Sequence, residues 1–155
     1  MDSALLQRIQ DFYFEFPGYG SGAKRIIIPH LPAYKAITYR NGDLSVVDCW
    51  TSNGSYSAGM MTIYADDRPV WVEHYGGMYE EAAIPLLKYA LEETRKTREF
   101  VGGRGPRRFS NSSMVYVNRP RSNDFTQFNG DEEIRSLVTG NLLGWHDYWG
   151  MALFS

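Results

Sequence analysis

Between Tyr34 and Tyr75 the residues alternate with a period of two, and this alternation constrains the fold more than any other feature of the chain. A period of two places successive side chains on opposite faces of a β-strand, whereas a helix repeats every 3.6 residues. The alternation is interrupted at Asn41-Gly42, a strong signal for a type I′ turn with positive φ at both central positions, and at Asp66-Asp67. The segment therefore predicts two antiparallel hairpins, with strands at 34–39, 44–50, 56–64 and 70–75.

Apolar residues recur at helical spacing in two other segments. The first, residues 4–16, follows the potential capping residues Asp2 and Ser3 and ends at Pro17-Gly18. The second, residues 80–98, begins with acidic and ends with basic side chains, which complements the helix dipole. Its apolar stripe consists of Ile84, Leu87 and Leu91. Three more strand candidates follow at 114–118, 125–138 (bent at Asn129-Gly130) and 142–153.

The order of helix and strands occurs twice, which suggests two similar α-βββ halves. A weak sequence echo supports this idea: Tyr56-x-x-Gly59-x-x-x-Ile63 resembles Phe128-x-Gly130-x-x-x-Ile134, and Tyr75-Gly76-Gly77-Met78 resembles Tyr148-Trp149-Gly150-Met151. Chance similarity between aromatic hairpins explains the echo about as well as duplication does. We predict one α+β domain over residues 1–155, with a curved, half-barrel-like antiparallel sheet and two helices.

The composition excludes several classes of protein. With 155 residues, 43% of them hydrophobic, the chain can bury a core and is not of the disordered class. Cys49 is the only cysteine, so a disulfide scaffold is excluded. The longest aliphatic run, Ile26-Ile27-Ile28, is far shorter than the ~20 residues of a membrane span, and the N-terminus lacks the pattern of a signal peptide. We expect a cytoplasmic protein without a membrane partner.

The positive charge is concentrated in residues 95–121, where eight basic residues stand against Glu99 alone although the whole chain has a net charge of −2. Arg104, Arg107 and Arg108 lie among glycines and beside Phe109, and this mixture of cations and an aromatic ring suits single-stranded nucleic acid or a phosphate. We expect these three arginines on a mobile loop at a pocket rim or a partner surface. A solvated charged loop is the simpler interpretation.

Three predicted strands each place a carboxylate two residues from large apolar or aromatic side chains, and therefore on the same face. The three faces carry Leu44, Val46, Asp48 and Trp50; Trp71, Glu73 and Tyr75; and Leu143, Trp145, Asp147 and Trp149. This assignment conflicts with the echo, because aligning Tyr75 with Tyr148 places Glu73 on His146 and Asp147 on the other face. We follow the alternation and expect Trp71, Glu73, Asp147 and Trp149 to line one cavity.

Aromatic walls with a carboxylate recognise an amine, a guanidinium or a hydroxyl-rich ligand through cation–π contacts and charge-assisted hydrogen bonds. A carboxylate in an apolar wall also has a raised pKa and can act as a general acid or base. Alternatively, the three carboxylates have a purely structural role, and each accepts hydrogen bonds from a neighbouring strand or turn.

Several short motifs occur together in the order of a known family. They are Asn41-Gly42-Asp43-Leu44 with Asp48, Pro69-Val70-Trp71 with Tyr75-Gly76-Gly77, Gly105-Pro106, and Phe125-x-x-Phe128-x-Gly130-x-Glu132-x-Ile134. Over about residues 35–151 the chain resembles a bacterial domain family of unknown function whose members are sometimes fused behind a helix-turn-helix regulator. The resemblance implies a domain that senses or docks something.

The sequence favours a non-catalytic module that binds a small polar or nucleotide-like ligand. The predicted ligand-binding residues are Asp48, Trp50, Trp71, Glu73, Tyr75, Trp145, Asp147, Trp149, Arg104, Arg107 and Arg108. No catalytic residue, metal site or cofactor is predicted, because the sequence contains no nucleophile, phosphate-loop or metal-ligand motif. Binding of nucleic acid or a protein partner through residues 95–121 is the alternative, and an unrecognised small acid–base enzyme is the second. The sequence leaves open whether the chain forms a homo-oligomer.

Overall fold

The computed structural model of the chain describes residues 2–19 and 22–154, which form nine strands, two α-helices and one 3-10 turn. The helices are α1 (Ser3–Glu15) and α2 (Ile84–Thr97), the latter preceded by the 3-10 turn Glu81–Ala83. The strands are β1 (Ile26–Ile27), β2 (Lys35–Asn41), β3 (Leu44–Asn53), β4 (Tyr56–Ala65), β5 (Arg68–Tyr79), β6 (Arg108–Ser110), β7 (Met114–Asp124), β8 (Gln127–Ser136) and β9 (Leu142–Ala152).

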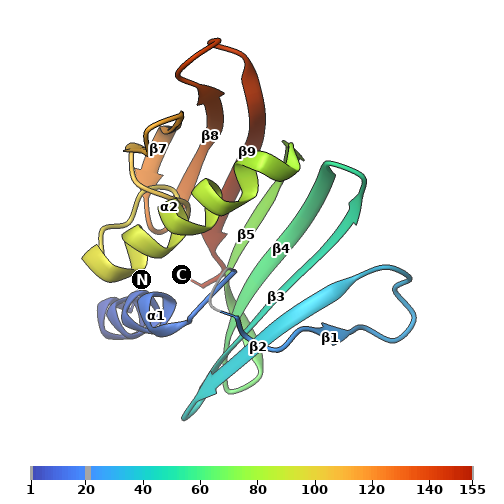
Figure 1. The fold of residues 1–155 in the computed structure, drawn as a ribbon. Helices are drawn as coiled ribbons and strands as arrows, with labels where there is room; N and C mark the ends of the chain where they lie inside the picture. The colour runs from blue at the N-terminus through green and yellow to red at the C-terminus, as the bar shows by residue number, and fades with distance from the viewer. Residues whose placement is uncertain (1, 20–21, 155) are drawn as a thin grey trace.

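The described strands form one antiparallel sheet in the order β1-β2-β3-β4-β5-β9-β8-β7-β6, with both helices on one side of its curved surface (Figure 1). The prediction of an α+β fold with a curved antiparallel sheet is confirmed. Helix α1 is followed by the short strand β1 and the four-stranded meander β2–β5, and α2 is followed by the four-stranded meander β6–β9, whereas the prediction had three strands in each α-βββ half. The two meanders, β2–β5 and β6–β9, meet at the central β5–β9 pair.

Two features of the hairpins differ from the prediction. The loop between β2 and β3 consists of Gly42 and Asp43, because Asn41 already pairs with Leu44, and only Gly42 has a positive φ, of 62°. Glycine alone at the first central position is typical of a type II′ turn. At Asn129-Gly130, where a bend was expected, β8 continues and pairs with β9, and the neighbouring β7 has a register shift opposite these two residues, between Pro120 and Ser122. The turn at Asp66-Asp67 is confirmed, with φ values of 47° and 60°.

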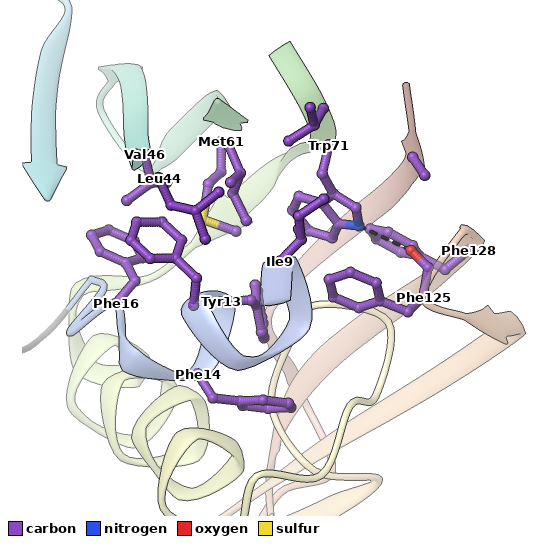
Figure 2. Packing of buried hydrophobic residues seen from close by; sticks show 14 of the residues in the cluster. Ile9, Tyr13, Phe14, Phe16, Leu44, Val46, Met61, Trp71, Phe125 and Phe128 are labelled. Carbon is purple, nitrogen blue, oxygen red and sulfur yellow. Dashed lines mark hydrogen bonds between the residues drawn. The ribbon is translucent and has the colours of Figure 1, made fainter. Parts of the chain in front are cut away.

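Helix α1 packs its apolar side on the β2–β5 part of the sheet (Figure 2). Asp2 caps the helix by accepting hydrogen bonds from the backbone amides of Ala4 and Leu5. Trp71 is fully buried in this cluster, and its Nε1 donates to the carbonyl oxygen of Phe125 at 2.9 Å. The helix and this tryptophan therefore fill one end of the concave face, and the space that remains for a site lies beside α2.

Strand β9 turns its two tryptophans, Trp145 and Trp149, outward, contrary to the prediction, while His146 and Tyr148 face inward. Its buried positions include Gly144 and Gly150, where a Cβ would lie 2.0 Å from the rings of Tyr79 and Phe128 respectively. Rings from neighbouring strands thus fill the space above the glycines. The large side chains of β9 that looked like a buried face, Trp145 and Trp149, consequently point to the exposed side.

Candidate functional site: a carboxylate-floored cavity under helix α2

A cavity of about 500 Å³ lies between the sheet and helix α2. Ile84, Leu87, Leu91 and Arg95 of α2 line one side of it, and inward-facing residues of β3, β4 and β5 line the other. Exposed lining residues mark its mouth: Arg25, Lys35, Ser52, Gly54, Ser55, Tyr56 and Glu81. A hollow of this size suits a small organic molecule.

Asp48, Met61 and Glu73 form a row across the floor of the cavity. Asp48 pairs with Met61 and Met61 pairs with Glu73, so the three side chains point to the same face of adjacent strands. The two carboxylates stand on strands that are two steps apart, with Cα atoms separated by roughly 10 Å. All three residues line the cavity.

Glu73 is the most exceptional residue of the floor. It is only 2% exposed, and its Oε1 accepts no hydrogen bond from any residue that the structure describes. The closest cationic atom, Nη1 of Arg104, lies 4.0 Å away. Burial raises the pKa of Glu73 to about 8, although the charge of Arg104 opposes the shift. At neutral pH this carboxyl group is therefore mostly protonated.

Asp48 lies at the other end of the row and is also buried. The hydroxyl of Tyr75 donates to its Oδ1 at 2.6 Å. Burial raises the pKa of Asp48, and this hydrogen bond opposes the shift. The floor thus contains two buried carboxyl groups, neither of which has a cationic side chain closer than 4.0 Å among the described residues.

Arg104 forms the centre of a second buried polar group, next to the first. Its Nη2 donates to Oε1 of Glu132 at 2.6 Å, and the hydroxyls of Tyr79 and Tyr116 also donate to that carboxylate. Burial alone would raise the pKa of Glu132, but the charge of Arg104 and these hydrogen bonds outweigh it and lower the pKa. Glu132 is therefore ionised and neutralises Arg104.

His146 borders the cavity as a neutral imidazole. Nη2 of Arg104 lies 3.3 Å from Nδ1 of His146, and arginine can only donate, so Nδ1 accepts. The remaining proton is on Nε2, which lies 3.3 Å from the hydroxyl oxygen of Ser57 and donates to it. Burial and the nearby charge of Arg104 lower the pKa of His146 to about 4.

The two halves of the sheet repeat the same arrangement around the directly paired Tyr75 and Tyr148. Tyr148 donates to Oδ1 of Asn118 at 2.6 Å, as Tyr75 donates to Asp48. Each tyrosine pairs with a glycine, Gly59 or Gly130, at which a Cβ would lie 2.5 or 2.3 Å from the phenol. The sequence echo therefore reflects corresponding positions.

The correspondence extends to the floor of the cavity. Asn118 pairs with Glu132 and Glu132 pairs with His146, which gives the second half a row equivalent to the first. Asn118 thus corresponds to Asp48, and His146 to Glu73. The Nδ2 of Asn118 donates to the carbonyl oxygens of Val101 and Gly105, at 3.0 and 2.7 Å. In the second half the chain itself fills the space above the row, whereas the first half leaves the cavity.

Of the predicted site residues, the structure brings five together at the cavity: Asp48, Trp50, Glu73, Tyr75 and Arg104. The expectation that Trp71, Glu73, Asp147 and Trp149 line one cavity is wrong. Trp71 belongs to the core under α1. Asp147 pairs with Gly76, one register position away from the inward Tyr75–Tyr148 pair, and its side chain is 69% exposed. Trp145 and Trp149 share that outer face, where Trp149 stacks on His74.

The three glycine-flanked arginines have separate positions. Arg104 is buried and ion-paired, not on a mobile rim, because Gly102 and Gly103 have positive φ values of 59° and 74° and pack its loop against Tyr148 and Glu73. Arg107 and Arg108 are exposed and do not line the cavity.

Most of the basic segment is engaged with carboxylates of the chain. Five of its eight cations form ion pairs, namely Lys96, Arg98, Arg104, Arg119 and Arg121. Salt bridges of this kind leave less charge for a phosphate backbone, so the structure adds no support for a nucleic-acid interface.

The sequence prediction missed His146, Glu132, Tyr79 and Asn118. The signal for His146 was present, since aligning Tyr75 with Tyr148 superposes it on Glu73.

Within the part of the chain that the structure describes, no three His, Cys, Asp or Glu side chains are grouped to hold a metal ion. Neither described helix combines the length and the apolar character needed to cross a membrane.

Comparison with protein families gives a match over two thirds of the chain. Residues 48–151 match the profile of DUF5680, a domain of unknown function. Neither the curated proteins nor the solved structures yield a significant match. The matched range begins at Asp48 and includes Glu73, Arg104, Glu132 and His146, so it contains most of the cavity floor.

Proposed function

Because this chain belongs to the DUF5680 family, whose function is unknown, we propose from the cavity itself that the domain reversibly binds a small polar ligand without turning it over. The observation that carries the proposal is the Oε1 atom of Glu73. It is buried at the cavity floor and accepts no hydrogen bond from the described residues. A buried polar atom without a partner costs on the order of 1–3 kcal/mol, and a ligand that hydrogen-bonds to it removes that cost.

The walls support a binding role. Trp50, Tyr19, Tyr75 and Tyr56 provide aromatic surface around the two carboxyl groups. Two further polar groups of the lining are already fixed: Tyr75 by Asp48, and His146 by Arg104 and Ser57. Groups held in this way orient a ligand and are poorly placed to shuttle protons. The resemblance to proteins fused behind helix-turn-helix domains agrees with a sensing role.

The proposal is tested by a thermal-shift screen with free amino acids, polyamines, nucleosides, nucleotides and sugars, each at millimolar concentration. The same screen is run on Ser52→Trp, which places a large ring at the mouth of the cavity. Asn53→Trp is the matched control, because Asn53 is the next residue of the same strand and does not line the cavity.

We expect one class of compound to raise the Tm of the parent protein and of Asn53→Trp but not of Ser52→Trp. Absence of any shift in the parent, or an equal shift in both tryptophan variants, would contradict binding in the cavity. Steady consumption of the stabilising compound would instead favour the acid–base enzyme.

A further inference from the structure

Resting on the proposed function, we infer that the ligand presents a guanidinium or ammonium group to Asp48 and Glu73, as the second half of the sheet holds the guanidinium of Arg104. This chemical class follows from the difference between the two corresponding rows of the sheet.

In the second half, the group that lies against the row of Asn118, Glu132 and His146 is a cation supplied by the chain itself. The guanidinium of Arg104 contacts Glu132 at 2.6 Å and His146 at 3.3 Å, which are the second and third members of that row. The carbonyl oxygens of the same loop accept from Asn118, the first member. The loop between α2 and β6 therefore acts as an internal ligand with a positively charged group.

In the first half, both ends of the row are carboxyl groups, and the cavity takes the place that the loop of Arg104 fills in the second half. Glu73 stands where His146 accepts a hydrogen bond from a guanidinium, and Asp48 stands where Asn118 donates to carbonyls. Replacing the donating amide by a carboxylate inverts the hydrogen-bonding requirement at that end, and Oε1 of Glu73 has no partner among the described residues at the other, so a ligand group with N–H or O–H donors satisfies both ends.

The balance of charge favours a positive donor over a neutral one. Asp48, Glu73 and Glu132 are three buried carboxyl groups, and Arg104 is the one buried arginine among the described residues. Its closest contact is with Glu132, at 2.6 Å against 4.0 Å for Glu73. Arg95 lines the cavity, and its charge opposes the rise in pKa of both Asp48 and Glu73, but it forms no ion pair with either, and its Nε donates to the carbonyl oxygen of Phe16 at 2.8 Å. A cation at the floor would pair with Asp48, which forms no ion pair with the described residues, and with Glu73, whose contact with Arg104 is long, at 4.0 Å.

The aromatic walls and the mouth define the remaining parts of the ligand. The guanidinium of Arg25 already lies 5.5 Å from the ring centroid of Trp50 and 5.9 Å from that of Tyr19, so this lining accommodates cations. Arg25 and Lys35 form no ion pair with the described residues and line the exposed mouth. They complement an anionic group at the outer end. A zwitterion with its cation innermost satisfies both ends of the cavity.

The test uses calorimetric titration of the whole protein with four probes: L-arginine, L-citrulline, agmatine and uridine. Citrulline has the length of arginine with a neutral urea in place of the guanidinium, and agmatine lacks the carboxylate. We expect arginine to bind at least ~10-fold more tightly than citrulline, and agmatine to bind between the two.

Two variants locate the effect. Glu73→Gln and Asp48→Asn should each reduce the preference for arginine over citrulline to less than ~3-fold. Asp48→Asn copies the residue at the corresponding position 118, so the fold should accept it, and circular dichroism verifies both variants. The matched control is Glu99→Gln, at an exposed acid outside the cavity, which should retain the full preference.

The outcomes separate the two proposals. If citrulline or uridine binds as tightly as arginine and Ser52→Trp blocks that binding, the cavity is a ligand site but the cationic class is wrong. If none of the probes binds and the broader screen is also negative, the proposed function fails and this inference fails with it. Binding of arginine that survives both Glu73→Gln and Ser52→Trp would place it outside the cavity and overturn the inference.

Discussion

The substitution Glu73→Gln removes an ionisable carboxyl group and should change how the stability of the protein depends on pH. In the folded protein burial raises the pKa of this group to about 8, against an ordinary value of 4.5. Between these two values the folded state holds a proton that the unfolded state has released, so the free energy of unfolding falls as pH rises. One pKa unit corresponds to about 1.4 kcal/mol, and the full shift therefore corresponds to a loss on the order of 5 kcal/mol, complete above pH 8.

His146 acts in the opposite direction over the lower part of this range. Its pKa is lowered from 6.5 to about 4, so it favours the folded state above pH 6.5 and loses that contribution as pH falls. The two effects oppose each other between about pH 4.5 and 6.5. Between pH 6.5 and 8 Glu73 acts without His146, and the expected decline there is about 2 kcal/mol.

The assay is urea unfolding at half-unit steps from pH 5.5 to 9 for the parent protein, Glu73→Gln and the exposed control Glu99→Gln. Glu73→Gln should remove the decline above pH 6.5 and should be the more stable protein at pH 9. Glu99→Gln should follow the parent. A parent whose stability is flat or rises from pH 6.5 to 8, or a glutamine variant with an unchanged slope, would refute the reasoning about the buried carboxyl.

Three further substitutions test the buried polar groups of the second half by thermal unfolding. Gly130→Ala should cost roughly 1–3 kcal/mol because its Cβ would lie 2.3 Å from the hydroxyl of Tyr148, and an unchanged Tm would show that the ring moves freely. Tyr148→Phe should cost about 1–3 kcal/mol by removing the hydrogen bond to Asn118, and an unchanged Tm would contradict a contribution of that bond to stability. Arg104→Met should cost about 3–5 kcal/mol, since Glu132 is left buried without its cation, and a folded variant of parental stability would contradict the assigned ion pair.

Local patterns predicted the elements of the fold because they depend on short-range chemistry. Helix α1 follows from its apolar spacing and the cap at Asp2, and the β4–β5 turn follows from Asp66-Asp67. The strands β1 and β6 were missed. They have two and three residues, and a period of two cannot be recognised in so short a segment.

The face of β9 could not be predicted from that strand alone. Two of its inward positions, Gly144 and Gly150, are glycines whose space is filled by Tyr79 of β5 and Phe128 of β8, and the tryptophans of the strand lie on the outer face. Asp48 and Glu73 were predicted correctly to face inward, because β3 and β5 carry their own apolar side chains toward the core. The decisive information for His146 was the correspondence between halves, which depends on strand pairing across the whole sheet.

The role of Arg104 was likewise beyond local reasoning. Glycines around an arginine resemble a flexible loop in sequence. Here Gly102 and Gly103 instead allow close packing against Tyr148 and Glu73, and they hold the guanidinium on Glu132, 28 residues away in the chain.

Proton release on binding is the most direct test of the claim that a cation binds to a carboxyl floor. L-arginine is titrated into the protein at pH 7 in two buffers of different ionisation enthalpy, and the difference between the measured heats gives the number of protons exchanged. With a pKa of about 8, Glu73 begins mostly protonated, and pairing with the guanidinium ionises it. The account predicts release of close to one proton per bound arginine in the parent and little exchange in Glu73→Gln. Binding without proton exchange, or with uptake of a proton, would contradict it.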